Sequence, residues 1–121
     1  MKTFRDLIVW QKSMELVTEV YKVSKTFPRS EQYGLTSQIR RCAVSIPSNI
    51  AEGFGRNSPN EFTRFLQISS GSLYELQTQI EISNKLDYIN NDEFDSLFQS
   101  AREIERLLTS LIRSIQDQQS A

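Results

Sequence analysis

Apolar residues recur every three or four positions in four separate runs of this sequence, and this spacing restricts the fold more than any other feature. Such spacing places side chains along one side of an α-helix. A β-strand needs apolar residues at every second position, and no segment keeps that alternation long enough. The pattern therefore predicts an all-α protein. Helices of about 22 to 28 residues joined by short turns pack antiparallel, so we expect an up-down-up-down antiparallel four-helix bundle.

The first two runs have recognisable ends. The first covers about residues 5–26 and stops before Phe27-Pro28, because the residue before a proline avoids helical geometry. The second contains Pro47, which removes one backbone hydrogen bond, so a kink is expected near Pro47; Gly53 and Gly55 then offer helix-ending positions. The side chains expected to face the core are Leu7, Trp10, Met14, Val17, Tyr21 and Ser24 in the first run, and Leu35, Ile39, Cys42, Ile46, Asn49 and Gly53 in the second.

The third and fourth runs open on helix-start signals. Ser58 offers a capping hydroxyl, Pro59 suits the first helical position, and Glu61 lies three residues after the cap. That run continues to about Leu86, and the fourth follows Asn90-Asn91 with acidic residues in its first turn. The expected core positions are Phe62, Leu66, Ser69, Leu73, Leu76, Ile80 and Ser83, then Phe94, Leu97, Ala101, Ile104, Leu108, Leu111 and Ile115.

Length and composition predict one domain over residues 1–121, with a net charge of −1 that gives no overall attraction to nucleic acid. Cys42 is the only cysteine, so no intramolecular disulfide is possible, which fits a reducing compartment. No window approaches the roughly 18 apolar residues of a membrane-spanning helix, and the N-terminus lacks a signal-peptide pattern. We therefore expect a cytoplasmic protein with no membrane partner.

Histidine, the residue most often used for general acid–base catalysis, is missing. The sequence has no histidine, which excludes Ser-His-Asp and Cys-His nucleophile arrangements and the Glu-x-x-His pairs of di-iron bundles. One cysteine without histidine cannot form a structural zinc site, and Cys42 is expected to be a packed, inert thiol. Glu75 lies beside a core-facing stripe, but no second carboxylate is placed with it for acid–base work. The sequence predicts no catalytic residue, no metal site, no cofactor and no enzymatic activity.

The strongest candidate for a site is the polar segment at residues 45–56. Asn49 occupies a core-facing position, and Glu52 and Arg56 follow at helical spacing, so the three share a side of the helix. One hypothesis is a polar pocket, or a phosphate held by Arg56 and the amides that open the third helix. The favoured alternative is that Asn49 and Glu52 satisfy backbone groups freed by Pro47 while the glycines cap the helix, because Gly-x-Gly-Arg lacks the Gly-Lys-Ser/Thr of a phosphate loop.

Two features indicate contacts beyond the predicted core. Gly71 lies in mid-helix, where glycine costs about 1 kcal/mol relative to alanine, so we expect a neighbouring helix of the bundle or of another subunit to approach closely; a substrate groove is the alternative. A second set of apolar residues suggests self-association, with a wider core face as the competing explanation. That set is Ile8, Val9, Leu16, Val20, Phe54, Phe65, Ile68, Phe98 and Leu107.

Six segments together make the chain similar to a known family. They are FRDLIVWQK at residues 4–12, FP at 27–28, YGL at 33–35, QIRRCAVSIPSNIAEG at 38–53, EFTRFL at 61–66 and GSLYEL at 71–76. From about Phe4 to Ile115 the chain closely resembles the four-helix-bundle proteins encoded in intervening sequences of bacterial 23S ribosomal RNA genes, also labelled S23 ribosomal proteins.

The resemblance implies a four-helix bundle that often assembles as a cyclic pentamer and has no established enzymatic activity. The family is similar in fold to the accessory variability protein of diversity-generating retroelements, which is basic and binds nucleic acid and a reverse transcriptase. This chain is slightly acidic instead. Asn49, Glu52, Arg56 and Glu75 match the family pattern, which assigns them no known role.

From these features we predict a non-enzymatic, homo-oligomeric scaffold or adaptor for RNA or a nucleoprotein partner. Arg40, Arg41, Arg56 and Arg64 are the predicted phosphate contacts, since such contacts need arginine or lysine on an exposed face. Arginines on a helix are also commonly solvated or salt-bridged. The alternative function is therefore a protein–protein assembly module that binds no nucleic acid.

Overall fold

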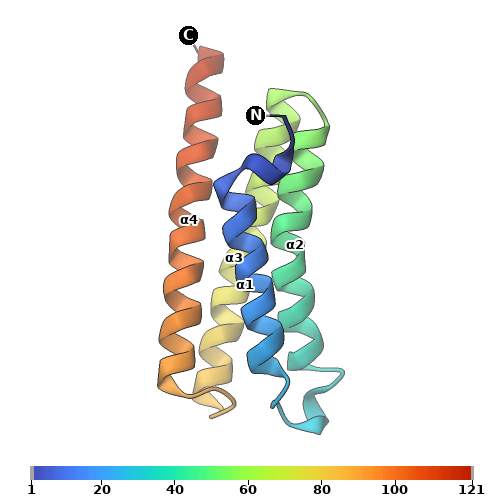
Figure 1. The fold of residues 1–121 in the computed structure, drawn as a ribbon, viewed down its shortest axis with the longest axis vertical. Helices are drawn as coiled ribbons and strands as arrows, with labels where there is room; N and C mark the ends of the chain where they lie inside the picture. The colour runs from blue at the N-terminus through green and yellow to red at the C-terminus, as the bar shows by residue number, and fades with distance from the viewer. Residues whose placement is uncertain (1, 121) are drawn as a thin grey trace.

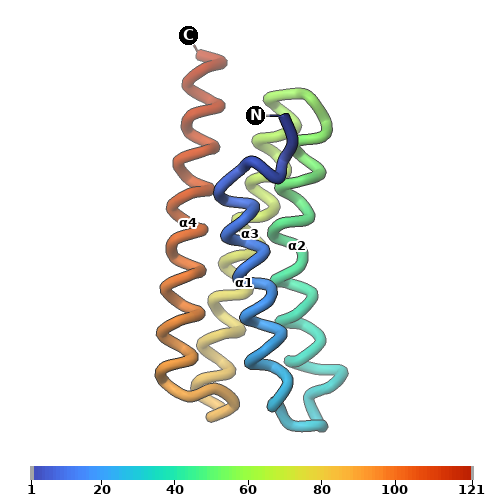
Figure 2. The backbone as a smooth tube through the Cα atoms, viewed as in Figure 1, coloured from blue at the N-terminus to red at the C-terminus, as the bar shows by residue number. Residues whose placement is uncertain are grey.

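The computed structural model describes residues 2–120, and within this range the chain forms four long helices and no strand (Figure 1). The helices are α1 (Ile8–Ser24), α2 (Leu35–Gly55), α3 (Pro59–Lys85) and α4 (Asn91–Ser120). Short 3₁₀ turns occupy Phe4–Asp6 and Arg29–Glu31. The chain reverses direction at each connection, and α1 packs beside both α2 and α4 (Figure 2). The predicted up-down-up-down bundle is confirmed.

The helix starts follow the local signals in the sequence. The Ser58 hydroxyl accepts a hydrogen bond from the Glu61 backbone N–H at 3.4 Å, with Pro59 in the first turn of α3, as predicted. At the start of α4, Asn90 and Glu93 accept hydrogen bonds from each other's backbone N–H at 2.7 and 2.9 Å. The first helix begins at Ile8, later than expected, because Leu7 is extended between the first 3₁₀ turn and α1.

Pro47 lies inside α2, and the helix continues past it to Gly55. A proline has no N–H, so the carbonyl of Ala43 loses its usual donor four residues along the helix. Hydroxyl groups bond to other carbonyls nearby. Ser48 donates to the Val44 carbonyl at 2.8 Å, and Ser69 of α3 donates to the Ile46 carbonyl at 3.0 Å. The second of these bonds ties α3 to α2 beside the proline.

Most of the core-facing positions predicted for α2, α3 and α4 are buried. The largest fully buried side chains among these positions are Ile39, Ile46, Leu66, Leu73, Leu76, Ile80, Leu97, Ile104 and Leu108. Ile50, which was not predicted to face the core, is fully buried as well. Ser69 and Ser83 are also buried, as their place in the predicted stripe requires. The spacing of apolar residues thus located the interior of three helices out of four.

The core-facing stripe predicted for α1 is wrong at its centre, although Leu7 and Ser24 at its ends are buried as expected. Met14 and Tyr21 are 42% and 40% exposed, while Leu16 and Val20 are 1% and 0% exposed. The buried stripe of α1 contains Val9, Leu16 and Val20. It could not be recognised from apolar spacing because Ser13, a polar residue, is part of it and is also buried. Its hydroxyl donates to the Val9 carbonyl at 2.6 Å, so the residue is buried with its donor satisfied.

The second apolar set lies mostly inside the bundle and not on its outer surface. Val9, Leu16, Val20 and Phe65 are buried and belong to a wider core face, which was the competing explanation. Ile8 and Ile68 remain on the surface, 60% and 41% exposed. The others of the set are half-buried. Most of this set is therefore not evidence for self-association.

Candidate functional site

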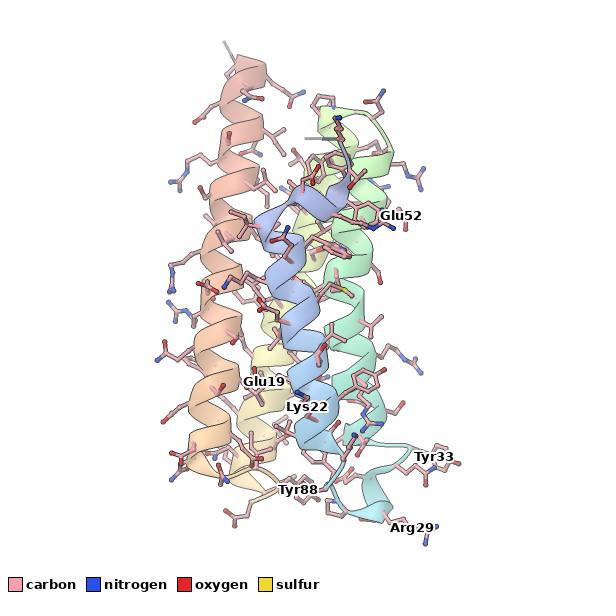
Figure 3. The ribbon with its side chains drawn as sticks, in the orientation of Figure 1. Glu19, Lys22, Arg29, Tyr33, Glu52 and Tyr88 are labelled. Carbon is pink, nitrogen blue, oxygen red and sulfur yellow. The ribbon has the colours of Figure 1, made fainter. Side chains whose placement is uncertain are left out.

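The polar segment of α2 does not converge on one pocket. The Asn49 side-chain amide donates to the Ser45 carbonyl at 2.8 Å and approaches the Ser45 hydroxyl at 3.0 Å. Glu52 is exposed near the opposite end of α2 from Tyr33 and forms an ion pair with Arg56 at 2.8 Å (Figure 3). Neither side chain bonds to the Ala43 carbonyl that Pro47 leaves without a donor. The favoured explanation, that Asn49 and Glu52 satisfy groups freed by the proline, is therefore wrong.

Gly53 is a contact point between helices and does not cap α2. A Cβ atom on Gly53 would lie 2.5 Å from the Cβ of Phe65 on α3, closer than two such atoms can approach. The helix ends two residues later, and Asn57 supplies the left-handed residue after it, with a φ of 55°. The close approach that we expected at Gly71 thus occurs at Gly53.

Gly71 has open space around it. No atom lies within 4 Å of the position that a Cβ would take, and the residue is exposed. A close approach by a helix of the same bundle is therefore wrong for Gly71. The cost of a mid-helix glycine is therefore not offset by packing within the bundle. A contact with another subunit and a substrate groove stay predictions.

Arg56 and Arg64 belong to a balanced charge cluster at the end of α2 and the start of α3. Both guanidinium groups lie over the ring of Phe65, at 5.2 and 4.7 Å from its centre. Arg56 pairs with Glu52 at 2.8 Å, and Arg64 pairs with Glu61 at 3.0 Å. Hydrogen bonds from Arg64 lower the pKa of Glu61 and keep it charged. Both arginines of this cluster are ion-paired, so neither guanidinium is available to a phosphate without breaking a salt bridge.

Arg40 and Arg41 are neighbours in sequence but point to different sides of α2. Arg40 lies over the ring of Tyr21 at 4.7 Å and donates to the Ser24 hydroxyl at 2.8 Å. These contacts place its charge at the C-terminal end of α1, where a cation is favourable. Arg41 is exposed and lines a different surface, between α2 and α3.

A polar crevice of about 470 Å³ lies between α2 and α3. Its floor contains Cys42 and Ser45 of α2, and both form a hydrogen bond with Ser72 of α3. The Cys42 thiol donates to the Ser72 carbonyl at 2.9 Å, and the hydroxyls of Ser45 and Ser72 are 2.9 Å apart. Burial, together with the nearby charge of Glu75, raises the pKa of the Cys42 thiol to about 12. The thiol stays protonated at neutral pH, in agreement with the inert cysteine that we expected.

Larger side chains also line this crevice. Arg41 and Gln38 come from α2, Glu75 comes from α3, and Tyr33 lies at the lower mouth. Within residues 2–120, neither Arg41 nor Gln38 makes a side-chain hydrogen bond or ion pair. Glu75 accepts one hydrogen bond, from the Gln79 amide at 3.4 Å. We refer to this surface as the α2–α3 crevice.

A family model described as 23S rRNA-intervening sequence protein matches residues 5–110, most of the chain. The chain belongs to this family. A crystal structure of a protein of unknown function from the S23 ribosomal protein family of Bacteroides thetaiotaomicron has the same fold, with a TM-score of 0.81. The two sequences are 26% identical over 87% of this chain and 98% of that one. A comparison with curated proteins gives no match.

The four polar residues that match the family pattern lie in three different places in the structure. Asn49 bonds within α2, Glu52 and Arg56 join the charge cluster around Phe65, and Glu75 lines the α2–α3 crevice. The sequence pattern indicated these four residues but not Tyr33, which also lines the crevice. In the sequence, the crevice is indicated only by two small polar residues, Ser45 and Ser72. The structure brings them together between α2 and α3.

The described residues carry no metal-binding group and no membrane-spanning helix. Residues 2–120 contain no group of three or more acidic, cysteine or histidine side chains placed to hold a metal ion. Across the same residues, no helix has both the length and the apolar character needed to span a bilayer.

Proposed function

We propose that this protein is a non-enzymatic, homo-oligomeric scaffold that associates with RNA or with a nucleoprotein. The missing histidine and the protonated thiol of Cys42 support the absence of an enzymatic role. The observation that carries the oligomeric part is an apolar groove on the outside of the bundle. The α2–α3 crevice supports the RNA part.

The apolar groove runs between the first 3₁₀ turn, α1 and α2, with a volume of about 380 Å³. Trp10, Met14 and Val17 line one side and Val44 and Pro47 the other. Met14 and Val44 are 42% and 39% exposed, so the groove leaves large apolar surface in contact with water. Covering such a surface is favourable by about 25 cal/mol per Å².

A second copy of the chain is the occupant that we propose for this groove. The net charge of −1 gives identical copies little mutual repulsion, which favours association of like chains. Groove residues of one copy would then pack on the surface of the next. A ring such as a pentamer forms if the contact joins two different surfaces and the rotation closes.

The first test is the mass in solution. We expect light scattering to give the wild-type protein a mass that is a multiple of the 14.0 kDa chain. A variant with both Met14→Glu and Val44→Glu places two charges in the apolar groove and should fall to the mass of one chain. Ile82→Glu is the matched control, because Ile82 is similarly exposed, at 41%, but lies on α3 outside the groove. A wild-type mass of one chain, or an unchanged mass in the double variant with its helicity intact, contradicts the proposal.

The RNA part rests on Arg41, whose guanidinium is exposed and unpaired within residues 2–120. We expect fluorescently labelled single-stranded RNA to bind at low salt, and Arg41→Glu to weaken binding by about tenfold. Arg106→Glu makes the same charge change on α4, which lies diagonally across the bundle from α2, and should bind nearly as well as wild type. Equal binding by the Arg41 variant would move the contact elsewhere. No binding by the wild type would favour the protein-only assembly module.

A further inference from the structure

The mouth of the α2–α3 crevice carries an exposed aromatic ring. Tyr33 is 90% exposed, more than any other large apolar side chain among the described residues, and it projects from the loop before α2 (Figure 3). The loop that carries it is well anchored. The Glu31 carboxylate accepts hydrogen bonds from the Leu35 N–H at 3.0 Å and from the Tyr88 hydroxyl at 2.9 Å. The backbone that carries Tyr33 is therefore fixed at the mouth, while its ring is exposed to a ligand.

An exposed aromatic ring beside an unpaired cation is an arrangement that suits a nucleotide. Nucleobases stack on aromatic side chains whatever their sequence, and a nearby arginine binds the phosphate. Arg41 lines the same crevice as Tyr33 and has no ion pair within residues 2–120. The crevice volume of about 470 Å³ lies within the range of about 300–1,000 Å³ typical of small-molecule sites.

Glu75 limits which base the crevice can accept. A carboxylate repels phosphate and only accepts hydrogen bonds, so it must face donor groups of the ligand. Guanine is the one common base whose Watson–Crick edge presents two adjacent donors, the N1–H and the 2-amino group. Adenine, cytosine and uracil each place an acceptor beside their donor on that edge. A carboxylate that accepts both guanine donors therefore distinguishes guanine from the other three bases.

Gly71 directly precedes Ser72, a residue that lines the crevice, and leaves the surface of α3 bare at its own position. Nothing lies within 4 Å of the Cβ position at this glycine. A bare helix surface lets the backbone of a ligand come close. This gives a reason for a mid-helix glycine that the bundle itself does not supply.

We propose that the α2–α3 crevice binds an unpaired guanosine of an RNA, with the base stacked on Tyr33, its Watson–Crick edge at Glu75 and the adjacent phosphate at Arg41. The inference rests on the proposed RNA association and adds the site and the base. Only an unpaired guanosine can bind in this way, because base pairing occupies the edge that Glu75 would contact.

The experiment compares short uridine oligonucleotides that carry one central guanosine, inosine, adenosine or uridine. Inosine retains the N1–H of guanosine but lacks the 2-amino group. We expect the wild-type protein to bind the guanosine oligonucleotide about tenfold more tightly than the inosine one, because one hydrogen bond to a charged group is lost. Glu75→Gln should remove this preference, while binding of the all-uridine oligonucleotide stays the same or improves.

The other two side chains have distinct expected effects. Tyr33→Ala should weaken binding of the guanosine oligonucleotide by about tenfold, and Tyr33→Phe, which keeps the stacking ring, should not. Arg41→Ala should weaken binding of every oligonucleotide and lower the slope of log affinity against log salt by about one. Glu81→Gln, an exposed carboxyl on α3 outside the crevice, is the control for Glu75→Gln.

The outcomes separate this inference from the proposed function. If RNA binds but Glu75→Gln leaves the guanosine preference intact, or no preference exists, the guanosine site is wrong and RNA association stands. If these variants change the mass in solution and leave RNA binding unchanged, the crevice is an interface between copies and the site is wrong. If no RNA binds, both proposals fall. Guanosine monophosphate is a further probe: binding as tight as that of the oligonucleotide supports a guanine site but overturns its assignment to RNA.

Discussion

Leu16→Ala is expected to lower the free energy of unfolding by about 3 kcal/mol, whereas Met14→Ala, two residues earlier on α1, is expected to lower it by less than about 0.5 kcal/mol. Leu16 is 1% exposed and Met14 is 42% exposed. Truncating the first removes buried methyl groups and leaves a cavity, while truncating the second removes groups that water already reaches. Urea unfolding followed by circular dichroism measures both.

Met14 also lines the proposed oligomer groove, so assembly has to be separated from folding. Stability that comes from association rises with protein concentration, and stability that comes from the core does not. We expect the effect of Leu16→Ala to be the same at two protein concentrations that differ widely. Equal losses for the two variants at both concentrations would restore the stripe of Met14 and Tyr21 as the buried face of α1.

The α1 stripe shows how far spacing alone can predict this fold. In α2, α3 and α4 one stripe is much more apolar than the rest, so the buried face can be predicted from sequence. In α1 two stripes compete, and the true one contains Ser13, which looks polar in sequence but satisfies its hydroxyl on the Val9 carbonyl. A side chain that bonds to its own helix costs little to bury, and this cannot be recognised from spacing.

The candidate site was less predictable than the fold, because it depends on which way neighbouring side chains point. Arg40 and Arg41 are adjacent, and only the structure shows that the first contacts Tyr21 and Ser24 while the second faces the α2–α3 crevice. Tyr33 belongs to a segment that matches the family, but nothing in that segment indicates an exposed ring beside a crevice. Its importance comes from its exposure and from the Glu31 anchor, both of which require the packed bundle.

The two internal helix glycines, Gly53 and Gly71, are expected to respond in opposite ways to the same substitution. Gly53→Ala should lower the free energy of unfolding by about 2 kcal/mol, because its new Cβ would lie 2.5 Å from the Cβ of Phe65. The atom it meets is attached directly to the α3 backbone and cannot move by rotation. Relief therefore requires α2 and α3 to separate, which loosens the packing around Gly53.

Gly71→Ala should raise the free energy of unfolding by up to about 1 kcal/mol, because alanine has the higher helix propensity and its Cβ meets nothing within 4 Å. Alanine has the higher propensity at Gly53 as well, so the difference of about 3 kcal/mol between the two variants measures the overlap with Phe65. Urea midpoints with an unchanged slope would report it. A stabilising Gly53→Ala would show that α2 and α3 are not in close contact there. Because Gly71 directly precedes Ser72 of the α2–α3 crevice, a variant that is more stable but binds RNA less tightly would show that this glycine serves the ligand and not the fold.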